Sequence, residues 1–129
     1  MNYPRQLLID TDVMIEYLRG SEQAIAFLES LERRPATSVI CLAELLAGAR
    51  NELERTSIEA FLQTFELLAV SSDIARLGGH YRQTYRKSHN TGLADALIAA
   101  TATTHNLTLA TFNVRHYPML ETHSPYSRS

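Results

Sequence analysis

The sequence contains almost no cysteine, lysine or tryptophan, and their scarcity excludes several classes of protein. Cys41 is its only cysteine, Lys87 is its only lysine, and tryptophan is absent. One cysteine excludes an internal disulfide framework and a cysteine-based zinc site. One lysine means that any mechanism built on a catalytic lysine must use Lys87.

Long hydrophobic runs are also missing. The longest apolar stretches fall far short of the roughly 20 residues that a membrane-spanning helix needs, so no membrane association is expected. The first residues, Met1–Arg5, lead directly into a strand-like run and lack the layout of a signal peptide. Together with the single cysteine, these features fit a protein of the reducing cytoplasm.

What the chain does contain is the composition of a folded domain. Its 129 residues suit one domain, and 45% hydrophobic and 20% charged residues are usual for a chain that buries a core. The net charge of −2 does not indicate a protein that binds nucleic acid. An enzyme that places metal ions between its carboxylates and a phosphate can nevertheless carry an acidic site. We expect one domain over residues 1–120 and a polar, mobile tail over residues 121–129 with little to bury.

Strands and helices alternate along the predicted structure. Short apolar or β-branched runs predict strands at 7–9, 37–40, 67–70 and 107–111. Helical patterns lie between them, at 13–18, after Ser21, and at 42–50, 52–65, 72–85 and 93–105. Gly78 and Gly79 should weaken their helix unless close packing there needs the missing side chains. The alternation predicts an α/β fold with a parallel sheet covered on both faces.

Three carboxylates lie where such a sheet binds ligands, which is beyond the carboxyl ends of its strands. Asp10 ends the first strand, Glu44 is in the helix after the second, and Asp95 is in the first turn of an Ala-rich helix. Each has an ordinary explanation: Asp10 as a helix cap, Glu44 as a solvated surface residue, Asp95 as a partner of the helix dipole. Together, beside small residues, they are typical of a site for a hard metal ion.

Four blocks of the sequence stand out between Leu7 and about Leu120. They are Leu7–Asp12, Leu42–Ala49, Ala94–Ala102 and Thr111–Tyr117. These blocks resemble PIN domains, and more narrowly the VapC toxins of bacterial and archaeal toxin–antitoxin pairs, and they follow one another in the family's order.

The resemblance implies a single three-layer α/β/α domain with a central parallel sheet. It also implies a metal-dependent endoribonuclease that hydrolyses RNA phosphodiester bonds with Mg²⁺ or Mn²⁺, its substrate an RNA such as tRNA or rRNA. A homodimer and a cognate VapB-like antitoxin that blocks the site are further implications. Residue by residue, Asp10, Glu44 and Asp95 match the metal-binding acids, Thr11 supports the first strand end, and Asn113 matches a polar site position.

The last block departs from the family pattern. Many relatives carry another acid at the position of Asn113 or of His116, and this chain has an acid at neither. Three carboxylates can hold one Mg²⁺ well, because that ion keeps several waters and borrows phosphate oxygens. We therefore expect one firmly held ion. His116 is either a contact to the substrate phosphate or an ordinary surface histidine.

The densest basic stretch is a second candidate substrate contact. It contains Arg76, Arg82, Arg86, Lys87 and His89. The functional interpretation, centred on Arg86, is a phosphate-binding flank beside the acids. A solvated helix face is the competing interpretation.

Other functions fit parts of the same pattern. An apolar strand that ends in Asp10 and Asp12 also resembles the first motif of haloacid-dehalogenase-type phosphatases, with Asp10 as nucleophile. That class and phospho-receiver domains both need a lysine near the site, and Lys87 is not at a strand end. A catalytically weak PIN-like module that binds RNA or protein without cutting is the non-enzymatic alternative, motivated by the missing fourth acid.

Overall fold

A five-stranded parallel sheet lies at the centre of the computed structural model, which describes residues 5–128. Its strand order is β3-β2-β1-β4-β5. The strands are β1 (Leu7–Ile9), β2 (Ala36–Ser38), β3 (Glu66–Leu68), β4 (Thr108–Ala110) and β5 (Thr122–His123). The helices are α1 (Thr11–Leu18), α2 (Glu22–Glu29), α3 (Val39–Ala47), α4 (Glu52–Leu62), α5 (Ser72–His89) and α6 (Leu93–Thr104), with a 3₁₀ turn η1 (Val114–His116).

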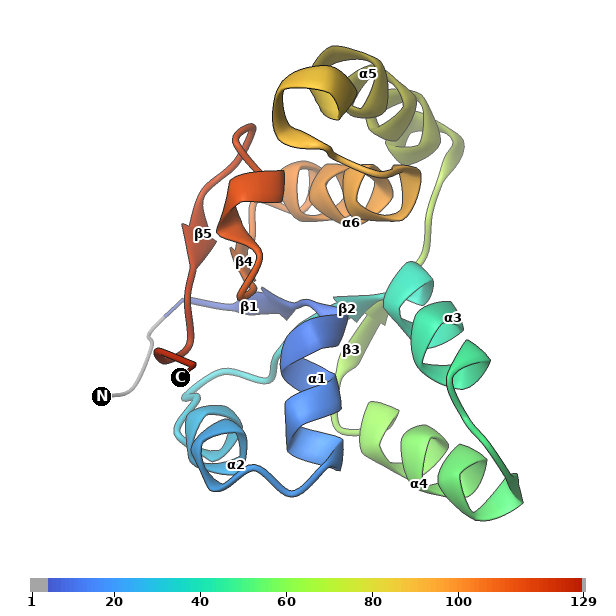
Figure 1. Cartoon of the computed structure of the whole chain (residues 1–129), viewed down its shortest axis with the longest axis vertical. Helices are drawn as coiled ribbons and strands as arrows, with labels where there is room; N and C mark the ends of the chain where they lie inside the picture. Colours follow the sequence, from blue (N-terminus) through green and yellow to red (C-terminus); the bar gives the residue numbers. More distant parts are fainter. Residues whose placement is uncertain (1–4, 129) are drawn as a thin grey trace.

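The helices cover both faces of the sheet. Helices α1, α2 and α4 lie on one side and α5 and α6 on the other, with α3 beside the β2 and β3 end (Figure 1). The central strands β2, β1 and β4 are buried on both faces, which explains why β1 is an unbroken apolar run whose residues are at most 1% exposed. The predicted α/β class with a parallel, doubly covered sheet is confirmed.

The second strand ends earlier than the sequence predicts. Val39 and Ile40 were expected to be strand residues, but they form the first turn of α3. The Ser38 side chain accepts a hydrogen bond from the backbone N–H of Ile40 at 3.0 Å and caps that helix. A local helix cap therefore outweighs the β-propensity of two branched side chains. As a result, β2 leads into α3 without a loop.

The C-terminal segment is part of the sheet, which corrects the expectation of a tail with little to bury. Strand β5 pairs in parallel with β4, where Thr122 lies opposite Leu109. Beyond β5, the Tyr126 ring packs edge-on against Phe112 at 5.0 Å, and the Arg128 guanidinium lies 4.1 Å from the centre of the Phe112 ring. The polar composition hides this strand because a two-residue strand is held mainly by its backbone groups.

Helices α5 and α6 pack closely because Gly78 has no side chain. A Cβ atom at Gly78 would lie 2.6 Å from Leu97 Cδ2 and 3.3 Å from Leu97 Cα, whereas one at Gly79 would meet nothing within 4 Å. The Tyr81 hydroxyl adds a hydrogen bond of 3.1 Å to Thr103 of α6. Close packing thus explains the first glycine of the pair. Among residues 5–128, no helix is both long and apolar enough to cross a membrane.

The two adjacent glycines should respond in opposite directions to alanine. Gly78→Ala should lower the free energy of unfolding by about 1–3 kcal/mol, because α6 must shift to admit the methyl group. Gly79→Ala should raise it by about 0.5–1 kcal/mol, because alanine favours the helix and meets no neighbour. Urea unfolding of both variants beside the parent protein measures the two effects. Equal changes in the same direction would contradict the packing argument.

Candidate active site

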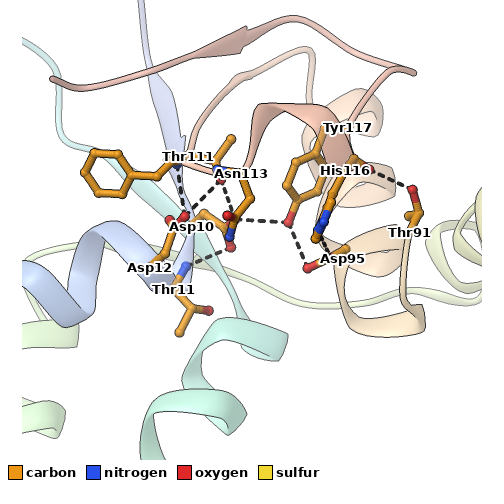
Figure 2. A network of polar contacts seen from close by, with 10 residues as sticks. Asp10, Thr11, Asp12, Thr91, Asp95, Thr111, Asn113, His116 and Tyr117 are labelled. Atoms are coloured by element: carbon orange, nitrogen blue, oxygen red, sulfur yellow. Dashed lines mark hydrogen bonds and ion pairs between the residues drawn. The ribbon is translucent and has the colours of Figure 1, made fainter. Parts of the chain in front are cut away.

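The candidate acids meet at the carboxyl edge of the sheet. Strand β1 ends at Ile9 and α1 begins at Thr11, so Asp10 is the only linking residue and the N-cap of α1. The neighbouring strand β4 runs into Thr111, followed by the η1 turn and Tyr117 (Figure 2). Parallel strands bring these segments together although they lie far apart in the chain.

Asp10 is a buried carboxylate with three donors. It is 5% exposed. Its Oδ1 accepts a hydrogen bond from the backbone N–H of Thr11 at 2.8 Å. Its Oδ2 accepts from the Thr111 hydroxyl at 2.8 Å and lies 3.0 Å from the Tyr117 hydroxyl. The side chain is therefore held in one orientation from three directions.

Burial raises the pKa of Asp10 from 3.8 to about 7, because a charged carboxylate loses its hydration there. The nearby Asp12 carboxylate contributes to this rise of the pKa, and hydrogen bonds from Thr111, Thr11 and Tyr117 oppose it. Without a cation, this carboxyl therefore exchanges its proton near neutral pH. A bound cation would favour the charged form.

Tyr117 joins the two principal acids. Its hydroxyl is 3.0 Å from Asp10 Oδ2 and 3.0 Å from Asp95 Oδ1, and the residue is 2% exposed (Figure 2). Burial, together with the two neighbouring carboxylates, raises the pKa of Tyr117 well above its usual value, so the phenol stays protonated. A phenol has one proton and can donate to only one acid at a time. Tyr117 thus links Asp10 and Asp95 through one hydroxyl group.

Asp95 lies in the first turn of α6, at the more open side of the site. Its side chain is 30% exposed, and Nδ1 of His116 lies 3.3 Å from its Oδ2. The carbonyl of His116 accepts a hydrogen bond of 2.7 Å from the buried Thr91 hydroxyl, which anchors the η1 turn to the loop before α6. His116 is therefore placed against Asp95.

Glu44 reaches the site through Thr11. The Thr11 hydroxyl donates to Glu44 Oε1 at 2.7 Å, while the Thr11 backbone N–H donates to Asp10. Glu44 itself is exposed on α3. Thr11 therefore links the buried acid to the solvent-facing one.

Asp12 fixes the segment after β4 to the start of α1. Its Oδ2 accepts a hydrogen bond from the backbone N–H of Phe112 at 3.0 Å and lies 3.3 Å from the Thr111 hydroxyl. Its Oδ1 is buried and has no hydrogen-bond partner among the described residues. Burial raises the pKa of Asp12, while the bond from Phe112 acts in the opposite direction.

The donor set fits a hard cation that keeps part of its own hydration. Within residues 5–128, no group of three or more His, Cys, Asp and Glu side chains is arranged as a metal cage. Asp10 and Asp95 nevertheless both lie against the Tyr117 hydroxyl. Glu44 adds a third carboxylate, which is connected to Asp10 through Thr11. Mg²⁺ binds through one or two carboxylates and retains several waters, so these oxygens suit it.

The other expected residues differ in their distance from the acids. Asn113 is exposed, and its backbone N–H donates to the Thr111 hydroxyl at 3.0 Å. Arg86 lies near the end of α5, is exposed, and has no hydrogen bond or ion pair to Asp10, Glu44 or Asp95. The sequence alone does not mark Thr111 and Tyr117 as site residues. Their only sequence signal is membership of the block that also contains Asn113 and His116.

The raised pKa of Asp10 predicts how stability depends on pH without metal. Because the folded pKa of about 7 exceeds the ordinary value of 3.8, the folded state binds the proton more tightly. Its contribution to stability is complete below pH ~4 and is lost as the pH rises through ~7. In EDTA, Asp10→Asn should therefore lose less stability than the parent between pH 5 and pH 8.

Urea unfolding at both pH values measures this difference. Asp73→Asn, at an exposed aspartate of α5, is the matched control and should behave like the parent. The same pH dependence in Asp10→Asn and Asp73→Asn would contradict a raised pKa of Asp10 in the folded protein.

Comparison with known proteins identifies the family of this chain. The family model described as PIN domain matches residues 7–119. Ribonuclease VapC10 of Mycobacterium tuberculosis is 43% identical over 122 residues, covering 92% of this chain and 91% of that protein. Ribonuclease VapC19 of the same organism is 43% identical over 117 residues, covering 87% and 92%. A toxin–antitoxin complex from Klebsiella pneumoniae has a TM-score of 0.82 at 30% identity, covering 95% of this chain and 100% of that chain. This chain belongs to the PIN domain family.

Proposed function

We propose that this chain is a metal-dependent endoribonuclease and the toxin of a VapBC-type toxin–antitoxin pair. In this proposal one Mg²⁺ or Mn²⁺ ion is held by Asp10 and Asp95, with Glu44 as the third carboxylate. The observation that carries the proposal is the pairing of Asp10 and Asp95 on the Tyr117 hydroxyl. The names of the relatives that are 43% identical, Ribonuclease VapC10 and VapC19, supply the reaction class.

In this proposal the ion has a buried ligand, Asp10, on one side and an exposed ligand, Glu44, on the other. Asp10, fixed by Thr11, Thr111 and Tyr117, supplies a charge that cannot turn away from the ion. Glu44 is exposed and held by one bond from Thr11, so it can adjust when substrate arrives. The bound ion supplies Lewis-acid polarisation of the scissile phosphate and of a water molecule.

Proton transfer belongs on the open side in this proposal. Asp95 is reachable by water and can accept a proton from the attacking water molecule. His116, at 3.3 Å from Asp95, is placed to donate a hydrogen bond to a phosphate oxygen when it is protonated. The N-termini of α1 and α6 lie at the same edge of the sheet, and their dipoles favour the negative charge of a phosphate.

The phosphatase and receiver alternatives are wrong for this chain. Both need a lysine at the strand ends, and Lys87 is exposed on α5 without a bond to any of the acids. The PIN domain match places the chain in a different family. The non-cutting PIN-like module is the alternative that an experiment must separate.

Cleavage of RNA in the presence of Mg²⁺ or Mn²⁺ tests the proposal. Asp10→Asn and Asp95→Asn should each lower kcat/KM by about a hundredfold or more, because each removes a charge from the ion. Glu44→Gln should cost less, about tenfold, because this side chain is exposed. Gel-based cleavage of a labelled RNA measures the rates, with EDTA as the metal-free control.

Glu59→Gln, at an exposed glutamate of α4, is the matched control and should cleave at the parent's rate. Calorimetric titration with Mn²⁺ separates the enzyme from the non-cutting module, which should take up little metal. Activity that survives both EDTA and Asp10→Asn would overturn the metal assignment.

The proposed partners are a VapB-like antitoxin and a second copy of the chain. Support for the antitoxin comes from the similar structure from Klebsiella pneumoniae, which is a toxin–antitoxin complex. Co-expression with the adjacent gene should give a complex in which RNA cleavage is suppressed, and cleavage should return when the partner is removed. Light scattering of the isolated chain should give the mass of a dimer. A monomer that the adjacent gene product neither binds nor inhibits would contradict this part of the proposal.

A further inference from the structure

Helix α5 carries an uninterrupted positive stretch in a chain of net negative charge. Residues 74–94 hold four of the chain's twelve Lys and Arg side chains and none of its fourteen acids. The four are Arg76, Arg82, Arg86 and Lys87, and His80 and His89 lie in the same segment. Helix α5 is on the outer side of α6, away from the sheet (Figure 1). The basic face of α5, defined as Arg82, Arg86, Lys87 and His89, is therefore available to a ligand.

The Arg and Lys side chains of this face are not used inside the fold, whereas the His89 ring lies 2.8 Å from the Ser88 hydroxyl. Arg76 pairs with Asp73 at 3.2 Å, but the side chains of Arg82, Arg86 and Lys87 have no ion pair or hydrogen bond with any residue in the range 5–128. Arg82 and Arg86 are four positions apart, so they lie on one side of the helix. His89 continues that side and is braced by the Tyr85 ring at 5.9 Å.

The face lacks the apolar centre of a protein interface. Between Gly79 and Thr91 the chain has no Leu, Ile, Val, Met or Phe. The aromatic residues there, Tyr81 and Tyr85, are half-buried. Protein interfaces depend on a buried apolar core with few charges. A free row of arginines without that core fits the phosphates of a polyanion instead.

The end of this face leads directly to the site. Helix α5 ends at His89, and Thr91 in the following loop donates to the carbonyl of His116 at 2.7 Å. His116 in turn lies 3.3 Å from Asp95. The loop after α5 therefore connects the basic face of α5 to the η1 turn, and that turn places His116 beside Asp95. Since the acids repel RNA, an attractive surface beside them would raise the local concentration of substrate.

We propose that the basic face of α5 binds the phosphate backbone of single-stranded RNA and delivers the strand to the acids. This inference rests on the proposed nuclease function and adds the surface by which the substrate is held. Each cation contacts phosphate and not base, so the face contributes affinity without sequence preference.

Helix electrostatics alone do not account for the face. Lys, Arg and His near a helix C-terminus are favourable to the dipole, but that effect is confined to the last turn. Arg82 lies two turns before the end of α5 and is half-buried. The row of cations extends further along the helix than the dipole effect does.

Binding should be measured without cleavage, with Asp10→Asn as the background and EDTA in the buffer. The probe is a fluorescein-labelled, mixed-sequence single-stranded RNA followed by anisotropy. Arg86→Glu should weaken binding about fivefold to tenfold. The double variant Arg82→Gln with Arg86→Gln should lower the slope of log Kd against log salt by about 0.7 for each phosphate that the protein no longer neutralises.

Arg33→Glu is the matched control. Arg33 is an exposed arginine without a partner among the described residues, and it precedes β2 at the opposite edge of the sheet. Its charge change equals that of Arg86→Glu, so it should leave RNA affinity nearly unchanged. In the cleaving parent background, Arg86→Glu should raise KM and leave kcat within about twofold.

The outcomes separate this inference from the proposed function. Equal weakening by Arg33→Glu and Arg86→Glu would mean that only net charge matters, and would overturn the inference while cleavage stands. Unchanged RNA affinity with a changed oligomeric state in Arg86→Glu would assign the face to a second copy of the chain instead. A parent protein that binds RNA through α5 and cleaves no RNA with either metal would leave the surface in place and overturn the nuclease proposal.

Discussion

The candidate site depends on keeping one charged group away from water. Asp10 is buried at the end of the central strand, where desolvation alone would favour the neutral acid. Thr11, Thr111 and Tyr117 hold it from three elements of the fold. A cation beside Asp10 would restore the charge balance that the buried carboxylate lacks, so the burial of Asp10 supports the proposal of a metal ion.

Much of the fold is readable from local sequence, and the limits have physical causes. The apolar run Leu7–Ile9 and the alternation of strands with helices indicate a parallel sheet, because central strands are buried on both faces. The predicted end of β2 is wrong because Ser38 caps a helix that begins at Val39, so the β-branched residues Val39 and Ile40 are helical. The segment after Glu121 is missed because β5 pairs through backbone groups, which leave no hydrophobic pattern. Amino-acid composition therefore gives no sign of a short strand, such as β5, that is held by backbone pairing.

The candidate site is readable to a different degree. Asp10, Glu44 and Asp95 stand out because strand ends and helix starts can be located along the chain. Tyr117 does not stand out, because its importance comes from lying equally close to two acids from different elements. That relation depends on the order of strands in the sheet, with β4 beside β1, which spacing along the chain does not reveal. The acids of the site can thus be predicted from the sequence, whereas Tyr117, which links two of them, can be recognised only in the folded structure.

The link between Asp10 and Thr111 also bears on the order in which the protein assembles. The two residues are 101 positions apart, so their contact closes nearly the whole chain into one loop. Such distant contacts form late, because the chain entropy lost in closing the loop must first be offset by other packing. A folding intermediate that has paired β1 with β2 and lacks β4 would hold Asp10 on its strand without the hydroxyls that orient it. The site is therefore complete only once β4 has paired with β1.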